Sequence, residues 1–334
     1  MWQVALTYIG ALVGAGFASG QELVTFFVAF GRKGFVGIGV VTLLFAVSGL
    51  MVIKLREKYH CHSSEQLQHL LFPAQLAVLM ACLLNMALWL GLVIMIIGCC
   101  TLLDQLLSVP KWLSFALVIL MVYLPLAKSG EGFLAANQYL VPLLIGIAMV
   151  ICLLFLSQPL PCVALARSHA LLPHWSVSAV VYWLYNMLLA MVVLVSLKPV
   201  KGLKKGVVMG AFFLGFLAFM ISLCLWLAPE FIRKGQMPML DLAFMMNQGA
   251  GWCYALVMII AMYTTALANC YGLVVNYEGR FKHRSGLLLM ILLPAMIFIP
   301  FDFAFLVGII YPILGYLGIP MMLALIIKAL TGGG

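Results

Sequence analysis

The sequence predicts an all-α membrane protein with about ten transmembrane helices, and three observations support this fold class. Of its 334 residues, 66% are hydrophobic and 8% are charged, whereas a soluble domain carries about 25% charged residues. Apolar runs of about 20 residues, the length that crosses a bilayer, recur along the whole chain. The basic residues cluster in the short stretches between these runs. We therefore expect a single transmembrane domain over residues 1–334.

The expected spans follow from the apolar runs, and glycine and proline punctuate their connections. In chain order they are residues 3–30, 34–55, 73–103, 111–127, 133–157, 171–197, 204–228, 249–277, 284–300 and 302–328. The breaks fall at Pro110, Gly130, Pro173, Gly202, Gly286 and Pro300. Two connections are long enough to form interfacial helices, residues 61–72 on the inside and 237–248 on the outside.

The distribution of basic residues predicts the orientation of the chain. An even number of spans places both termini on one side of the membrane. With the termini inside, the inner loops and the tail carry Lys54, Arg56, Lys58, Lys128, Lys198, Lys201, Lys204, Lys205, Arg280, Lys282, Arg284 and Lys328. The outer loops then carry Arg32, Lys33, Lys111, Arg167, Arg233 and Lys234. Because positive charge accumulates in cytoplasmic loops, both termini are predicted to be cytoplasmic.

The first span contains a stretch that is unusual for a membrane helix, GAGFASGQE at residues 14–22. Its glycines weaken a helix, and Ser19 with Glu22 matches the S-x-x-E capping box that starts a new helix. We therefore predict a discontinuous first helix, with one half ending near Val13 and the second starting near Ser19. The alternative is an unbroken helix whose small residues form a tight packing face.

Glu22 is the acidic residue inside this first span, and two roles are open to it. As part of the capping box it stabilises the start of the second half-helix. As an ionisable group at membrane depth it is a candidate for proton or ion coupling. The two roles are compatible, because protonation of a capping carboxylate weakens the half-helix.

The segment YIGALVGAGFASGQELVTFF, residues 8–27, closely resembles the start of the YkvI-type bacterial membrane proteins. These are similar to members of the amino acid–polyamine–organocation superfamily with the LeuT fold. The resemblance implies two inverted five-helix repeats, about residues 3–157 and 171–328, with the first and sixth helices broken at mid-membrane. It also implies a bacterial cytoplasmic membrane protein that transports a small solute.

The resemblance further implies a sodium site between the first and eighth helices. Gly10 and Val13 stand at the carbonyl positions that bind Na+ in the sodium-coupled relatives, and Ala261, Thr264 and Thr265 match the A-x-x-[ST]-[ST] pattern. Residues i, i+3 and i+4 share one helix face, and hydroxyl and carbonyl oxygens suit an alkali cation. The alternative is that both threonines hydrogen-bond to their own helix.

The substrate is expected between the first break and the middle of the sixth helix. The residues of this predicted substrate site are Gly14, Ala15, Gly16, Phe17, Ser19, Tyr182, Tyr185 and Asn186. The sixth span contains neither glycine nor proline between residues 176 and 193, so its interruption would rest on Tyr185 and Asn186. The alternative is a continuous helix with a polar face.

Motifs for other chemistry are missing. The chain has no H-E-x-x-H and no G-x-S-x-G, so an enzyme is not expected. The basic loops fit membrane topology and lipid headgroups rather than nucleic acid. The predicted function is secondary transport of an amino acid or similar small zwitterion, with Na+ as the coupling ion. A ligand sensor of the same fold and a transporter that couples to protons through Glu22 are the alternatives.

Overall fold

The computed structural model describes residues 1–61, 63–128, 134–158, 171–197, 202–228, 235–277, 281 and 283–331. All regular elements within these residues are helices. Six are long and apolar enough to cross a membrane: α4 (Arg32–Tyr59), α6 (Ala74–Leu107), α9 (Trp175–Ser196), α10 (Leu203–Leu227), α13 (Gln248–Tyr277) and α15 (Phe303–Thr331). The all-α membrane class is confirmed.

The other predicted spans correspond to shorter or interrupted helices. The first is divided into α1 (Trp2–Leu12), α2 (Ala15–Ser19), α3 (Gln21–Phe26) and the 3-10 helix η1 (Val28–Phe30). The fourth and fifth are α7 (Lys111–Lys128) and α8 (Leu134–Leu156), and the ninth is α14 (Arg284–Leu292) continued by the 3-10 helix η4 (Leu293–Phe298). Apolar segments thus lie where ten spans were predicted, but the count of ten and the inverted repeat stay predictions.

Two short helices occupy the connections in which interfacial helices were expected. α5 (Ser64–Leu71) is capped by Ser63, whose hydroxyl accepts a hydrogen bond from the Gln66 N–H at 3.2 Å. α12 (Pro238–Met246) is much more buried than a helix lying on the membrane surface, because Met239, Leu240 and Leu242 are fully enclosed. It packs against α13, α8 and α2. α12 therefore covers the second segment of the interrupted first helix.

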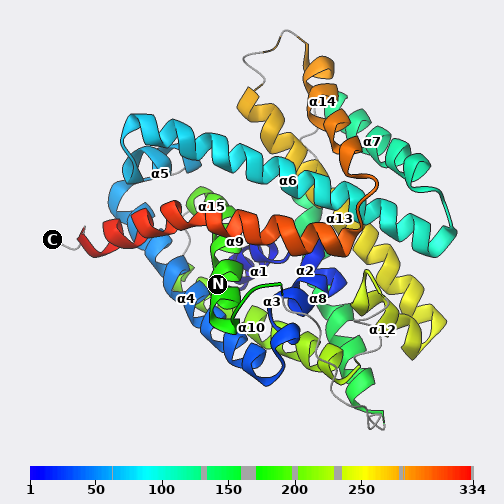
Figure 1. Cartoon of the computed structure of the whole chain (residues 1–334). Coiled ribbons are helices and arrows are strands. Elements are labelled where there is room, and N and C mark those ends of the chain that lie inside the picture. Colours follow the sequence, from blue (N-terminus) through cyan, green and yellow to red (C-terminus); the bar gives the residue numbers. More distant parts are fainter. Residues whose placement is uncertain are drawn as a thin grey trace.

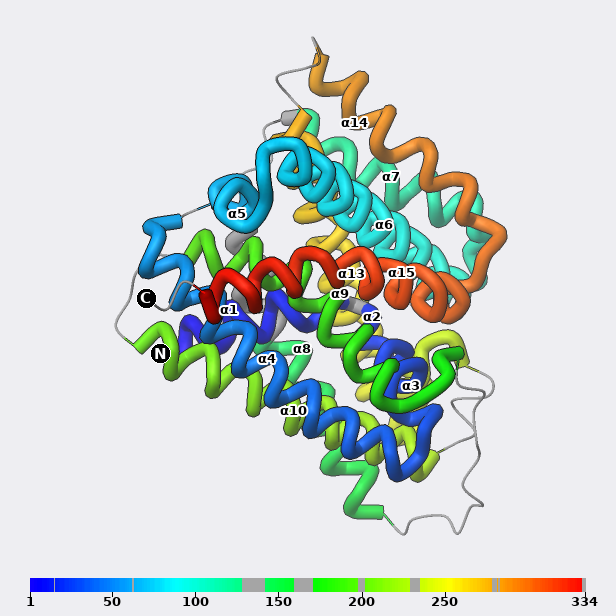
Figure 2. The backbone as a smooth tube through the Cα atoms, turned by 60° about the vertical axis from the view of Figure 1, so that its left-hand side comes forward, coloured from blue at the N-terminus to red at the C-terminus, as the bar shows by residue number. Residues whose placement is uncertain are grey.

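The interrupted first helix lies in the interior of the bundle (Figure 1). α1 packs against α10, α9 and α8, and its inward residues Tyr8, Ile9 and Leu12 are almost fully buried. α15 runs along α9 and also contacts α6, and Figure 2 shows α1 enclosed between these helices and α10. The element that was predicted to carry the site is therefore shielded by several neighbouring helices.

A close helix crossing brings α15 to α9. A Cβ added to Gly315 would lie 2.6 Å from the carbonyl oxygen of Val181, which is closer than side-chain atoms approach. Small residues at such a crossing allow two backbones to come together in a membrane protein. This contact sets Tyr311, one turn before Gly315, beside the middle of α9.

A buried arginine fixes the end of α9. Arg56 on α4 is 3% exposed, and its Nε donates to the carbonyl oxygen of Val195 at 2.9 Å. Its Nη2 donates to the carbonyl oxygen of Leu197. A cation at a helix C-terminus satisfies carbonyls that have no intrahelical partner and complements the helix dipole. α4 and α9 are therefore held together at this end.

Candidate functional site

The predicted interruption of the first helix is present. α1 ends at Leu12, and its last backbone hydrogen bond runs from the Val13 N–H to the Ile9 carbonyl at 2.7 Å. Val13 (φ −89°, ψ 102°) and Gly14 (φ −92°, ψ 177°) are extended. The carbonyls that follow Ile9 therefore lack helical partners, as at any helix C-terminus.

The restart of the helix differs from the prediction in place and in chemistry. The second segment, α2, begins at Ala15 and ends at Ser19, and Gly20 (φ 80°) separates it from α3. The Ser19 hydroxyl donates to the Gly16 carbonyl at 2.8 Å and accepts from the Gln21 N–H at 3.2 Å. The predicted capping box between Ser19 and Glu22 is therefore wrong, because the left-handed turn at Gly20 separates the two residues into different helices.

Glu22 points back toward the break. Its side chain is 2% exposed. The hydroxyl of Tyr185 donates to Oε2, and hydrogen bonds from the Tyr311 hydroxyl and the Phe17 backbone N–H also reach the carboxylate. The carboxylate therefore joins three elements at one point: α2, the middle of α9 and the first half of α15.

Gly16 makes room for this carboxylate. A Cβ added to Gly16 would overlap Glu22 Oε1 and would lie 2.9 Å from Glu22 Cδ. A Cβ added to Gly14 would lie 3.8 Å from the same oxygen. The glycines of the GAG sequence thus have a second role besides loosening the helix, because they let a carboxylate approach the backbone at the break.

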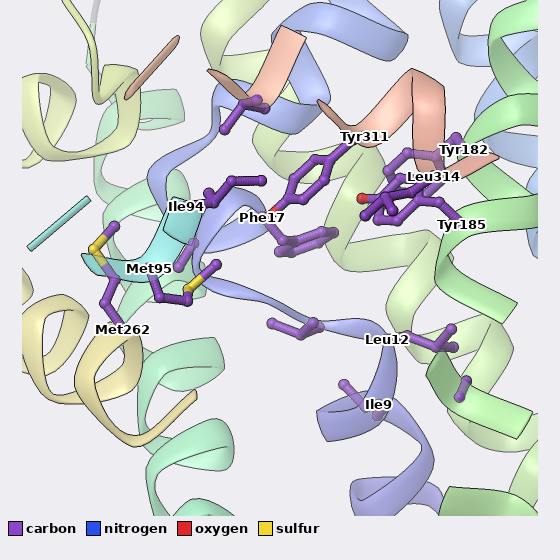
Figure 3. Close-up of a cluster of buried hydrophobic side chains, with 14 of the residues drawn as sticks. Ile9, Leu12, Phe17, Ile94, Met95, Tyr182, Tyr185, Met262, Tyr311 and Leu314 are labelled. Carbon is purple, nitrogen blue, oxygen red and sulfur yellow. The ribbon is translucent and has the colours of Figure 1, made fainter. Parts of the chain in front are cut away.

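Aromatic rings surround the carboxylate. The rings of Tyr185 and Tyr311 are stacked, with centroids 4.7 Å apart and an interplanar angle of 10°. Tyr182 meets Tyr185 edge to face at 5.4 Å, and Phe26 contacts both Tyr182 and Tyr185. Figure 3 shows Tyr182, Tyr185 and Tyr311 gathered near Phe17. We call Glu22 together with Tyr182, Tyr185 and Tyr311 the tyrosine–carboxylate cluster.

The sixth span is not interrupted, which corrects the prediction of a second broken helix. α9 is one α-helix from Trp175 to Ser196. The Asn186 Nδ2 donates to the Tyr182 carbonyl at 3.0 Å, so the amide that was expected to satisfy a break is bound within its own helix. Without glycine or proline in this stretch, nothing in the backbone opposes a continuous helix. Tyr182 and Tyr185 join the cluster, whereas Asn186 contacts it only through its hydrogen bond to Tyr182.

Tyr311 is a site residue that sequence reasoning missed. It lies in the last span, beside Pro312, and is 5% exposed. A tyrosine hydroxyl within a span does not by itself indicate a functional site. Only the crossing of α15 over α9 brings this residue to Glu22.

The residues of the predicted sodium site lie on α1 and α13. Gly10 and Val13 flank the end of α1, where carbonyls are released. The hydroxyls of Thr264 and Thr265 donate to the Ala261 carbonyl at 3.1 and 2.8 Å, which is the alternative considered for this pair. The sodium assignment stays a prediction.

α2 is held in place from two further sides. The Tyr254 hydroxyl on α13 donates to the Ala18 carbonyl. The side chain of Met239 on α12 lies against Gly20, because a Cβ added there would be 2.9 Å from Met239 Cγ. A hydrogen bond of 2.9 Å from Gln105 Nε2 to Asp241 Oδ1 also ties α12 to α6. α12 is thus in direct contact with the turn that ends α2.

A separate cavity of about 490 Å³ lies between α6, α13 and α14. It is lined by Cys82, Asn85, Met86, Trp89, Leu273, Tyr277, Phe281, Leu287, Met290, Ile291 and Pro294. None of these belongs to the predicted substrate site or to the predicted sodium site. In the described part of the chain, no group of three or more His, Cys, Asp or Glu residues is placed to hold a metal ion.

Comparisons with known sequences give relatives over the whole chain. The Bacillus subtilis (strain 168) membrane protein YkvI is 27% identical over 338 residues, covering 98% of this chain and 95% of the relative. The YyaD protein of the same organism is 26% identical over 341 residues, covering 98% and 97%. Both relatives are described as uncharacterized. No family model matches the chain.

Comparisons with solved structures identify the fold. The inward-facing conformation of Mhp1 superposes with a TM-score of 0.58 at 12% identity, over 94% of this chain and 72% of that chain. A manganese transporter of Eremococcus coleocola superposes with a TM-score of 0.56 at 15% identity, over 97% and 77%. At these identities the likeness shows the fold alone. It agrees with the LeuT-like architecture that the sequence predicts.

Proposed function

Because the chain is homologous to the membrane proteins YkvI and YyaD of Bacillus subtilis and has a LeuT-like fold, we propose that it is a secondary active transporter of a small amine-bearing solute. The observation that carries the proposal is the Glu22 carboxylate, buried at the interruption of the first helix and hydrogen-bonded by tyrosines of α9 and α15. A broken membrane helix with polar groups at mid-membrane is the usual form of a transporter binding site.

The geometry supports recognition of an ammonium group at this site. The carbonyls after Ile9 and the carboxylate of Glu22 both present negative charge to the break. Amino acids and similar zwitterions carry an ammonium group, so they belong to the proposed class of solutes. The solute reaches the cluster through a change of conformation, because Phe17, Glu22 and Tyr185 are at most 4% exposed. Alternating access would move the first, second, sixth and seventh spans against the others.

Glu22 is our preferred coupling group, with the proton as the coupling ion. A carboxylate at membrane depth that exchanges a proton with either side in turn links solute movement to the pH gradient. In proteoliposomes we expect solute accumulation when a pH gradient is imposed and none when it is collapsed by an ionophore. A ligand sensor would give thermal stabilisation by a solute without accumulation, and that result would replace transport by sensing.

Sodium coupling is the second candidate, favoured by the released carbonyls of α1 and the threonine hydroxyls of α13. If Na+ binds there, the double variant Thr264→Val, Thr265→Val raises the Na+ concentration for half-maximal uptake about tenfold or more, because two oxygen ligands are lost. The measurement is initial uptake against Na+ concentration, with Thr7→Val on α1 as the control. Unchanged sodium dependence in the double variant rejects the site.

A further inference from the structure

The negative charge of Glu22 has no cationic side chain beside it in the described residues. The ion pairs found there, Lys111–Asp302 and Lys204–Glu57, lie near helix ends. A buried charge is expensive unless it is paired. Hydrogen bonds from tyrosine and backbone donors orient the carboxylate, but they leave its charge uncompensated. A proton or a bound cation is therefore needed to balance Glu22.

The groups that face Glu22 from the helices around α3 are tyrosine hydroxyls, which are ordinarily uncharged near neutral pH. α9 contributes Tyr182 and Tyr185, and α15 contributes Tyr311. α10 also packs against α3, but its lysines lie in its first turn, where Lys204 pairs with Glu57. Titration of the site in this range is therefore titration of Glu22.

The carboxylate also occupies the place where a zwitterion's own carboxylate would bind. The free N–H groups at the start of a helix are a natural binding place for the carboxylate of a zwitterion. In the structure the Phe17 N–H donates to Glu22, and Glu22 Oε1 lies against Gly16. A second carboxylate at this point would meet a like charge in a site of low dielectric. The site is therefore better suited to a solute without a carboxylate.

The walls of the site match an organic cation. The rings of Phe26, Tyr182, Tyr185 and Tyr311 contact one another at centroid distances of 4.7–5.8 Å, and the three tyrosines belong to the cluster around Glu22. The face of an aromatic ring attracts an ammonium group through the ring quadrupole, most strongly when water is excluded. Carboxylate, carbonyls and rings thus all favour positive charge.

We propose that the solute is an organic ammonium ion without a carboxylate, and that it competes with a proton for Glu22, so that the protein exchanges amine for protons. This rests on the proposed transport function and narrows its substrate class. The exchange balances: an ammonium ion that binds displaces one proton from the carboxyl group to the side that is open, and rebinding of one proton releases the ammonium ion on the other side. Each turnover of a monoamine moves one positive charge in each direction, so it is electroneutral.

The first test is binding to the purified full chain. The probes are amines with their parent amino acids: isobutylamine and valine, phenethylamine and phenylalanine, putrescine and ornithine. We expect at least one amine to bind more tightly than its amino acid. At pH values low enough to protonate Glu22, the apparent affinity for the amine should weaken by about tenfold for each unit of falling pH, because one proton competes with the amine for the carboxylate. Calorimetry in buffers of different ionisation enthalpy should detect the released proton.

Variants make this test specific. Glu22→Gln should abolish both amine binding and its pH dependence, whereas Glu65→Gln, at an exposed position on α5, should leave both unchanged. If the glutamine variant does not fold, Glu22→Asp, which keeps the charge but shortens the side chain, is tested for amine binding in its place. Tighter binding of the amino acids, binding that does not respond to pH, or a panel without an amine ligand would each overturn the proposal.

The second test separates this inference from the transport proposal. Proteoliposomes that enclose a pH dye should show proton efflux when the bound amine is added outside, with no change of membrane potential for a monoamine. If an amine binds in competition with a proton but no proton efflux occurs, the transport proposal is refuted and the amine-selective site is retained. Accumulation of amino acids but not of amines would refute the amine-selective site and leave transport standing.

Discussion

Glu22→Gln is expected to reduce transport by about 100-fold or more and to remove the response of the residual uptake to pH. Glutamine is close to glutamate in size, so the space beside Gly16 stays filled, and its amide oxygen still accepts a hydrogen bond from Tyr185. The variant loses the titratable charge and little else. The measurement is initial uptake in proteoliposomes as a function of pH between about pH 5 and 8.

The control for this variant is Glu65→Gln, which removes a carboxylate from the exposed face of α5. Its uptake and pH response should equal those of the wild type. Tyr311→Phe provides a graded comparison, because it removes one hydrogen bond to Glu22 and keeps the ring that stacks on Tyr185. We expect a loss of about tenfold, in line with one hydrogen bond to a charged group. Wild-type uptake with an intact pH response in Glu22→Gln would exclude Glu22 as the coupling group.

The sequence was sufficient to locate the break because its cause is local. Glycines at residues 14, 16 and 20 lie within a span that is otherwise apolar, and helix propensity reports such a weakness directly. The observed interruption at Val13 and Gly14 is therefore where the composition changes. The same local reasoning failed for Ser19 and Glu22, because a capping box requires both residues on one helix. The left-handed conformation of Gly20 ends α2 between them.

The partners of Glu22 depend on tertiary contacts that no local pattern reports. Tyr185 was a predicted site residue, but its role was assigned to a break in α9 that does not exist. Tyr311 comes from the other end of the chain and reaches the site through the close crossing at Gly315. The burial of α12 against α2 likewise depends on packing. Local signals thus predicted the element that carries the site, and the fold determined which side chains complete it.

Gly16→Ala is the second variant with a large expected effect, because the added methyl group would occupy the position of the Glu22 carboxylate. Gly16 lies within α2, so alanine suits its backbone and the effect is one of space. Overpacking of this kind costs about 1–3 kcal/mol when the neighbours cannot move. We expect the carboxylate to leave the Phe17 N–H and the two tyrosines. Uptake should then fall by about 100-fold, close to the effect of Glu22→Gln. A functional group that is displaced by about 1 Å can cost about this factor in rate.

The matched control is Gly39→Ala on α4, where an added Cβ meets nothing within 4 Å. The same chemical change there should leave uptake and melting temperature at wild-type values. A second-site variant tests the mechanism itself: Glu22→Asp shortens the acid by one methylene group, so Gly16→Ala with Glu22→Asp should recover part of the activity that Gly16→Ala alone has lost. Wild-type activity of Gly16→Ala would show that the carboxylate can bind elsewhere. Loss without recovery in the double variant would show that Gly16 acts on the helix break rather than on the fit of Glu22.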